Sequence, residues 1–281
     1  MDYKISNDKI IITGKDEFDP MHILECGQIF RYSKIDGGYN VISGDKFATI
    51  VDTKEGYEIL TKDTKYFENF FDLQRNYTKI KQKLAKNNQT LKLATDFGGG
   101  IRILNQQPFE MIISFIISAN NNIKRIQSLV EKLSVRCGKN MGDYFAFPTL
   151  DELSTLSIDD LRALGMGFRA KYIYATVKKL KNIDLESFRQ KSTAEIVEFL
   201  TSLDGVGPKV ADCILLFAYH KTDCFPVDTW VEKIYNTYFA AEKLSNRSVI
   251  RKNLLSIFGE DSGYAQQYLF YYKRELDKNL K

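Results

Sequence analysis

The amino-acid sequence predicts an α+β fold, with an N-terminal antiparallel β-sheet domain over residues 1–95 and a larger all-helical domain over residues 96–281. Three observations predict it. Short β-type runs fill the first 60 residues, helical periodicity fills the chain after residue 97, and 281 residues suit one large or two modest domains. We expect the functional site in the cleft between the two domains.

Turn residues divide the N-terminal 60 residues into short strands that indicate an antiparallel meander. The runs are IIITG, GQIFRYSKI, YNVIS and FATIVD, and Gly37-Gly38 and Gly44-Asp45 supply the positive φ that tight hairpins need. After about Tyr66 the strand pattern stops. A stretch rich in Lys, Asn and Gln over residues 79–92 predicts a surface helix and turn.

Helical periodicity dominates from Phe97 onward. Pro108 opens an apolar helix, and a second helix is expected from about Ile123, with apolar residues at i, i+3 and i+4. Further amphipathic segments lie near residues 159–164, 169–182, 193–203, 208–220, 228–239, 247–257 and 263–275.

Composition and charge exclude several classes of protein. The 40 Lys and Arg residues against 36 Asp and Glu give a net charge of +4, which permits an anionic partner without requiring one. No apolar run approaches the roughly 18 residues that span a bilayer, and the charged start MDYKISNDKI is unlike a signal peptide, so we expect neither membrane association nor secretion. The four cysteines are far apart without a CxxC pair, which argues against a zinc ribbon, an iron–sulfur loop and a disulfide scaffold and favours a reducing cytoplasm. We also expect no catalytic metal and no cofactor.

The sharpest local signal is the stretch STAEIVEFLTSLDGVGPKVADCILLFAYH over residues 192–220. Ser192 opens the first helix with a capping box, and Pro208 starts the second. Gly205 and Gly207 allow a turn that β-carbons would block. Such a hairpin points free N–H groups outward from a helix N-terminus, which attracts phosphate oxygens, although a plain helical hairpin is the better explanation of the turn taken alone.

Lys209 lies in the first turn of the second helix, where the helix dipole disfavours a cation. We therefore expect its pKa to be lowered towards about 7–8, as a nucleophilic, Schiff-base-forming lysine requires. Asp228, in FPVDTW, is suited to capping the next helix. A carboxylate there is also suited to stabilising positive charge on a nearby sugar ring or to pairing with Lys209.

The arrangement LDGVGPKVADC followed by FPVDTW resembles the helix–hairpin–helix base-excision DNA glycosylases. Within them it is most similar to the 8-oxoguanine DNA glycosylase/AP lyase branch, as a bacterial member of the eukaryotic-type enzymes. Four further pieces in matching order extend the resemblance over most of the chain: CGQIFR at 26–31, SANNNIKR at 118–125, LGMGFRA at 164–170 and GYAQQYLF at 263–270. The chain lacks the four-cysteine cluster of endonuclease III and the adenine glycosylases, and Lys209 separates it from the alkylated-base branch, which works with the Asp alone.

The resemblance implies a monomeric, nucleoid-associated enzyme of the bacterial cytoplasm that removes 8-oxoguanine opposite cytosine from double-stranded DNA. Lys209 would attack the anomeric carbon of the flipped nucleotide, Asp228 would stabilise charge on the sugar, and the resulting imine would permit strand cleavage by β-elimination. Two alternatives stay open: a non-catalytic helix–hairpin–helix DNA-binding module, and a glycosylase for another oxidised base.

Base recognition is implied for four residues. The carbonyl of Gly27 would accept the hydrogen that oxidation places on N7, and Cys213 and Phe270 would lie on the two faces of the flipped base. Gln266 would contact the Watson–Crick edge, one helical turn before Phe270. Taken alone, Cys213 and Phe270 are better explained as core residues, and Gly27 is equally well explained as a turn glycine. The alternative for Gln266 is a solvated helix residue.

Base flipping leaves a hole and an orphaned partner, so such an enzyme needs a wedge and a reader for the unpaired base. Phe168 resembles the wedge, and Asn120, Arg125 and Arg169 resemble the residues that contact the opposite cytosine. Trp230 stands where the eukaryotic members usually have His, and Lys273 where an acidic residue is expected, so the contacts to the neighbouring phosphate stay open. The expected DNA-binding residues are Asn120, Arg125, Phe168, Arg169, Gly205, Gly207 and Trp230.

Overall fold

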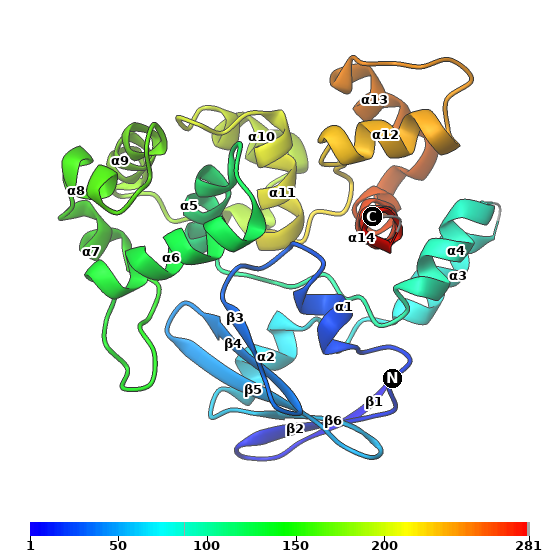
Figure 1. The fold of residues 1–281 in the computed structure, drawn as a ribbon, viewed down its shortest axis with the longest axis horizontal. Coiled ribbons are helices and arrows are strands. Elements are labelled where there is room, and N and C mark those ends of the chain that lie inside the picture. The colour runs from blue at the N-terminus through cyan, green and yellow to red at the C-terminus, as the bar shows by residue number, and fades with distance from the viewer. Residues whose placement is uncertain (87, 280–281) are drawn as a thin grey trace.

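The computed structural model describes residues 1–86 and 88–279, with side chains as far as residue 277. One sheet forms the lower layer in Figure 1, and a larger group of helices lies above it. The α+β class predicted from the sequence is thereby confirmed. Among the described residues, no helix is both long and apolar enough to cross a membrane.

Six strands form one antiparallel sheet in the order β1-β2-β6-β5-β4-β3. In chain order, β1 to β6 span Asp2–Ile5, Lys9–Thr13, Tyr32–Ile35, Gly38–Ser43, Lys46–Asp52 and Gly56–Leu60. The predicted meander is confirmed for β3 to β6, and β6 then pairs with β2. Gly37 and Gly44 have φ of +68° and +59°, as the two hairpins require. Gly38 is needed for a different reason, because a Cβ there would collide with the carbonyl of Ile50 on β5.

The segment over residues 27–31 differs from the prediction, since it is irregular rather than the start of a strand. The buried amide of Gln28 explains the difference. Its Nε2 donates to the carbonyls of Ile23 at 2.9 Å and Arg102 at 2.8 Å, and its Oε1 accepts from the N–H of Leu104 at 2.9 Å. These bonds fix the segment to the backbone at Arg102 and Leu104, about 75 positions away, and such partners cannot be identified from local sequence.

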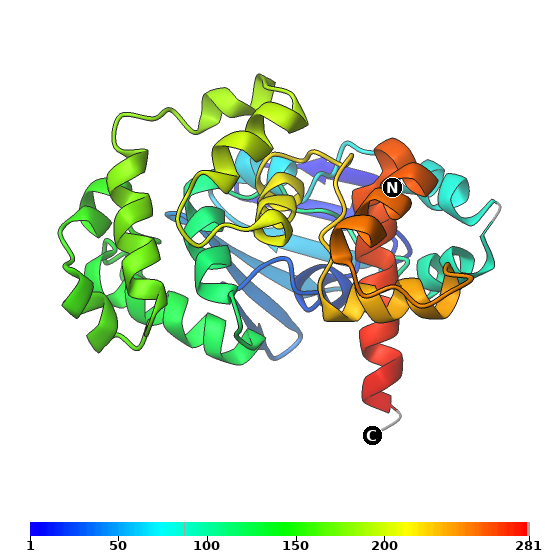
Figure 2. The same cartoon turned by 90° about the horizontal axis from the view of Figure 1, so that it is seen from above.

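The α-helices are α1 to α14, and they span Pro20–Leu24, Thr64–Phe70, Tyr77–Ala85, Gln89–Phe97, Pro108–Ser118, Ile123–Cys137, Leu150–Ser154, Ile158–Ala163, Arg169–Leu180, Thr193–Thr201, Pro208–Ala218, Thr229–Tyr238, Arg247–Phe258 and Ser262–Asn279. Every amphipathic segment predicted after residue 97 is confirmed as a helix to within a few residues. The helices α1, α2 and α7, of five to seven residues, were not predicted, because so short a segment carries too little periodicity. Figure 2 shows α14 as a long rod beside the other helices.

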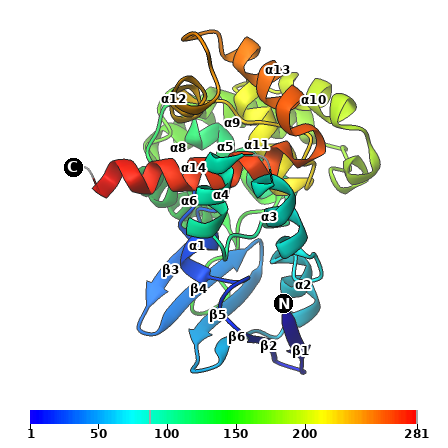
Figure 3. The same ribbon diagram turned by 90° about the vertical axis from the view of Figure 1, so that its right-hand side faces the viewer.

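Helices α3 and α4 belong to the helical part of the molecule by their packing. Figure 3 shows them beside α14, and their buried residues Tyr77, Leu84 and Leu91 join the core of the helices. A separate core lies between the sheet and the helices α1 and α2; it extends along the chain from Ile10 to Leu73 and includes Leu104. The domain border near residue 95 stays a prediction.

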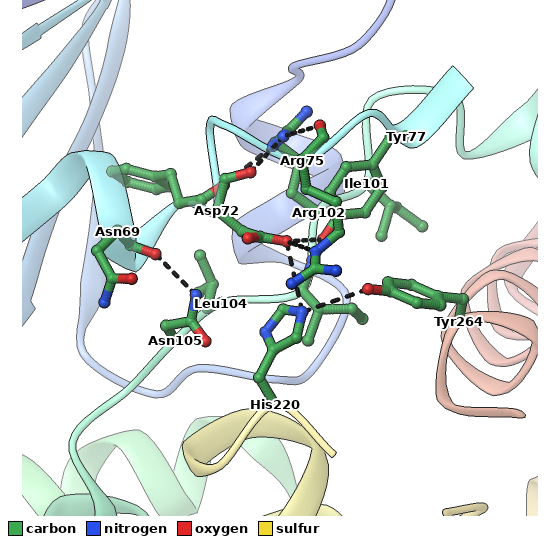
Figure 4. A network of polar contacts seen from close by, with 12 residues as sticks. Asn69, Asp72, Arg75, Tyr77, Ile101, Arg102, Leu104, Asn105, His220 and Tyr264 are labelled. Carbon is green, nitrogen blue, oxygen red and sulfur yellow. Dashed lines mark hydrogen bonds and ion pairs between the residues drawn. The ribbon is translucent and has the colours of Figure 1, made fainter. Parts of the chain in front are cut away.

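A network of buried polar groups joins the two parts of the molecule (Figure 4). Nε2 of His220, just after α11, lies 3.4 Å from a carboxylate oxygen of Asp72 and 3.3 Å from the hydroxyl of Tyr264 on α14. Arg102 is fully buried beside them and donates to the carbonyl of Phe71 at 2.9 Å. The network therefore joins the segment that follows α2 to the end of α11 and to α14, the two helices that carry Lys209, Cys213, Gln266 and Phe270.

Candidate active site

The hairpin between α10 and α11 forms as predicted, with the Ser192 capping box present. Gly205 has φ of +82°, and a Cβ there would lie 2.7 Å from the ring of Tyr172, so glycine is required. The prediction that a Cβ would block the turn is wrong for Gly207, because its φ is −89° and a Cβ would meet nothing within 4 Å. The protein itself does not need glycine at this exposed position, so the space in front of Gly207 is open to a binding partner.

Lys209 lies in the first turn of α11 and is partly buried. Its Nζ is 5.7 Å from the centroid of the Phe115 ring, and it is hydrogen-bonded to Cys213 and within the field of Asp228. The pKa of Lys209 is raised, because its interaction with Cys213, whose thiol loses its proton in the same high pH range, and its attraction to the Asp228 carboxylate outweigh the effect of burial. The predicted lowering of this pKa is therefore wrong, since it considered the helix dipole without the facing acidic groups.

Asp228 is the N-cap of α12, as predicted. One carboxylate oxygen, Oδ1, accepts from the backbone N–H groups of Trp230 and Val231, both at 2.9 Å. The cap fixes the carboxylate beside Lys209 while leaving Oδ2 without a hydrogen-bond donor among the described residues. Capping and charge stabilisation are thus compatible at this residue. Trp230 is partly buried and stacks under Nζ of Lys233, 5.1 Å from the ring centroid.

Cys213 lies one turn after Lys209 and is buried. Burial raises the pKa of its thiol to about 11, so the thiol is neutral at pH 7. On α14, Gln266 is only 6% exposed and its Oε1 has no hydrogen-bond partner among the described residues. An unpaired buried amide oxygen is costly, so a bound group that donates to Gln266 would remove that cost.

Gly27 lies against α14, far from it in sequence. Its φ is +90°, and a Cβ there would lie 3.6 Å from the ring of Phe270 and 3.6 Å from Nη1 of Arg274. Nε2 of Gln267 donates to the carbonyl of Cys26 at 3.1 Å, which fixes the segment before Gly27. No described residue donates to the carbonyl of Gly27 itself. The structure therefore brings Gly27 and Phe270 together and leaves this carbonyl free to accept.

The residues expected to contact the opposite base also lie together. Asn120 has φ of +50° and is exposed, and Arg169 donates to its carbonyl at 3.0 Å and to that of Ala119 at 2.9 Å. Arg125 is near enough to lower the pKa of Arg169, together with the larger effect of burial. Phe168 is 52% exposed, as a wedge must be. The guanidinium of Arg169 is thus mainly used in holding the loop, so Asn120 and Arg125 have the freer polar groups.

Comparison with known proteins agrees with this arrangement. Residues 10–112 match the family model for the 8-oxoguanine DNA glycosylase N-terminal domain, and residues 113–260 match that for the HhH-GPD superfamily base excision DNA repair proteins. The chain belongs to the 8-oxoguanine DNA glycosylase family. The expected helix–hairpin–helix superfamily is thereby confirmed.

Three solved or curated relatives illustrate how far the family likeness extends. The crystal structure of Clostridium acetobutylicum 8-oxoguanine glycosylase/lyase in complex with double-stranded DNA containing cytosine opposite 8-oxoG is 39% identical, with a TM-score of 0.91, and the match covers 99% of this chain and 100% of that one. A probable N-glycosylase/DNA lyase of Methanothermobacter thermautotrophicus is 33% identical over 74% of this chain and 72% of its own length. The N-glycosylase/DNA lyase of Arabidopsis thaliana is 39% identical over 64% of this chain, and the match spans 54% of that protein.

Sequence reasoning missed Arg274 in this family member. Arg274 follows Phe270 by one helical turn, is 8% exposed, and lies against Gly27. The i, i+4 spacing from Phe270 was the available signal, since it places both side chains on one face of the helix.

Proposed function

We propose that the chain releases 8-oxoguanine opposite cytosine from duplex DNA and then cleaves the strand as an AP lyase. The observation that carries the proposal is Lys209, held at the start of the hairpin helix between Cys213 and Asp228 in a chain of this family. A module that only gripped phosphate would have no use for an amine kept partly buried beside a carboxylate.

The raised pKa of Lys209 indicates the order of the proton transfers. The C1′–N9 bond breaks with its electron pair going to the purine, and Asp228 stabilises the positive charge that develops on the sugar. The departing purine anion takes a proton from the Lys209 ammonium. The neutral amine then bonds to C1′, the ring opens to an imine, and loss of a 2′ proton expels the 3′ phosphate.

The oxidised base would be recognised by two hydrogen-bond acceptors of the site that have no partner among the described residues. The Gly27 carbonyl would accept from N7–H, which guanine lacks, and Gln266 Oε1 would accept from the Watson–Crick edge. Cys213 and Phe270 would cover the two faces of the base. On the other side of the duplex, Phe168 would fill the vacated space.

The opposite cytosine would be contacted by Asn120 and Arg125, with Arg169 holding their loop. Gly207 and the hairpin N–H groups would bind a phosphate, and Trp230 would lie beside the flipped nucleotide. We also propose a monomer in the bacterial cytoplasm, associated with the nucleoid. The four free cysteines suit a reducing compartment, and the 39% identity to a clostridial structure suits a bacterial source.

Single-turnover base release tests the proposal. Duplexes carrying one lesion each are compared: 8-oxoguanine opposite C, A, G and T, a second oxidised base, an alkylated base and undamaged guanine. We expect the fastest release from 8-oxoguanine opposite cytosine. If only a different base were released, the substrate would be that base and not 8-oxoguanine. Tight binding of all duplexes without release of any base would support the non-catalytic DNA-binding module.

A further inference from the structure

Arg274 is a buried cation beside the proposed lesion pocket that the reaction described above does not use. Its guanidinium centre is 5.6 Å from the Phe270 ring centroid and 5.5 Å from that of Tyr271. The side chain is 8% exposed. A buried guanidinium normally has all its donors paired, so each of its N–H groups needs a partner.

Two of the three guanidinium nitrogens have partners. Nη2 donates to the carbonyl of Glu25, and Nε donates to the carboxylate of Glu275 at 3.0 Å. These bonds fix the plane of the guanidinium against the segment that leads into Gly27. Nη1 is buried and has no hydrogen-bond partner among the described residues.

This unpaired nitrogen lies near Gly27 and Phe270. Nη1 lies 3.6 Å from the point that a Cβ on Gly27 would occupy, and Phe270 lies 3.6 Å from the same point. Nη1 of Arg274 thus lies beside Gly27, whose carbonyl accepts no hydrogen bond from a described residue. An acceptor and a donor side by side match a cis amide edge, which offers N–H and C=O in adjacent positions.

Oxidised guanine carries such an edge at N7–H and C8=O, whereas guanine has a bare nitrogen acceptor at N7 and a hydrogen on C8. We propose that Nη1 of Arg274 donates a hydrogen bond to the oxo oxygen on C8 while the Gly27 carbonyl accepts from N7–H. This inference rests on the proposed function. Arg274 is then a specificity-determining residue that recognises the second atom changed by oxidation.

Equilibrium binding tests the inference in a Lys209→Gln background, which prevents turnover. Affinities are measured for duplexes with 8-oxoguanine or guanine opposite cytosine. Arg274→Met should weaken binding of the 8-oxoguanine duplex by about 10- to 100-fold, the range for a hydrogen bond to a charged group, because the oxo oxygen loses its donor. Binding of the guanine duplex, held through its phosphates, should change by less than about twofold.

A matched control comes from Lys273, the residue that precedes Arg274 on α14. Lys273→Met removes a cation one position away, whose described partner is Asp277 at 2.6 Å, and should leave the preference for 8-oxoguanine intact. Arg274→Lys keeps the charge and a donor, so it should recover part of the preference. It also provides the test if Arg274→Met does not fold.

A purely structural role for Arg274 is separated by changing the base. A duplex with 8-thioxoguanine keeps N7–H but replaces the oxygen with a weakly accepting sulfur. If Arg274 bonds to the oxo oxygen, the sulfur substitution and Arg274→Met should not have additive effects, since either one removes the same bond. Additive losses would mean that Arg274 only holds the Glu25–Gly27 segment, and would overturn the inference.

The outcomes also separate this inference from the proposed function. If the protein that retains Arg274 showed no preference for 8-oxoguanine, both the proposed function and this inference would be overturned. A preference that survives Arg274→Met at full strength would overturn this inference alone.

Discussion

Acidification should destabilise the folded protein through His220, the histidine at the junction in Figure 4. Burial lowers its pKa from 6.5 to about 4, against the opposing effect of Asp72. Between these two values the unfolded chain binds a proton on His220 and the folded protein does not. Stability is therefore lost as the pH falls from 6.5 to 4.

The size of the loss follows from the shift. A change of 2.5 pKa units, 6.5 − 4, at about 1.36 kcal/mol per unit corresponds to roughly 3 kcal/mol at pH 4 and below. Because the His220 side chain is 10% exposed, solvent screening reduces this figure little. The loss should be nearly complete at pH 4 and nearly absent at pH 7.

Urea denaturation at pH 7, 5.5 and 4 measures the effect when the protein is compared with His220→Asn. Asparagine tolerates the positive φ of +52° at this position and does not titrate. The free energy of unfolding should fall by about 3 kcal/mol less in the variant than in the parent between pH 7 and 4. Equal pH dependence in the two proteins would refute the reasoning, because every other titrating group is shared.

The remaining predictions concern α11 and the face that meets the opposite base. Arg251→Met should destabilise the protein by about 3–5 kcal/mol in urea denaturation, because Asp212 is 1% exposed and would lose its bidentate partner at 2.6 and 2.8 Å; a loss under about 1 kcal/mol would contradict this. Cys213→Ala should lower the pKa of Lys209 and move the pH–rate profile of imine formation on abasic DNA towards lower pH, and an unmoved profile would show that the thiol does not act on the amine. Arg125→Ala should flatten the preference for cytosine in base release opposite C, A, G and T, and unchanged selectivity would remove Arg125 from that role.

Local signals explain how much of the structure could be predicted from sequence. Positive φ at Gly37 and Gly44, the Ser192 capping box and the Asp228 cap each depend on a few neighbouring residues, and all are present. The long amphipathic helices were predictable because their apolar spacing repeats over several turns. Gly207 shows the limit of such reasoning, since a glycine in a turn was assumed to be needed by the protein's own backbone.

What could not be predicted depends on contacts between distant residues. The loop at Gly27 is held by α14, about 240 positions away, so its irregular backbone has no local signal. The i, i+4 spacing places Arg274 on the same helix face as Phe270, but nothing local indicates that this face lies against Gly27. The pKa of Lys209 has the same origin, because it depends on side chains that only the fold brings to the amine. Resemblance to a family grouped the candidate residues. The structure adds which of their polar atoms have no hydrogen-bond partner among the described residues, namely the Gly27 carbonyl and Oε1 of Gln266.

Borohydride trapping tests the central claim most directly. Reduction during incubation with an 8-oxoguanine:cytosine duplex converts an enzyme–DNA imine into a stable covalent adduct. The account predicts an adduct with the unmodified protein, whose linkage maps to Nζ of Lys209, and none with Lys209→Gln, which should still bind the duplex. An adduct of equal yield in Lys209→Gln, or one mapped to another amine, would contradict it.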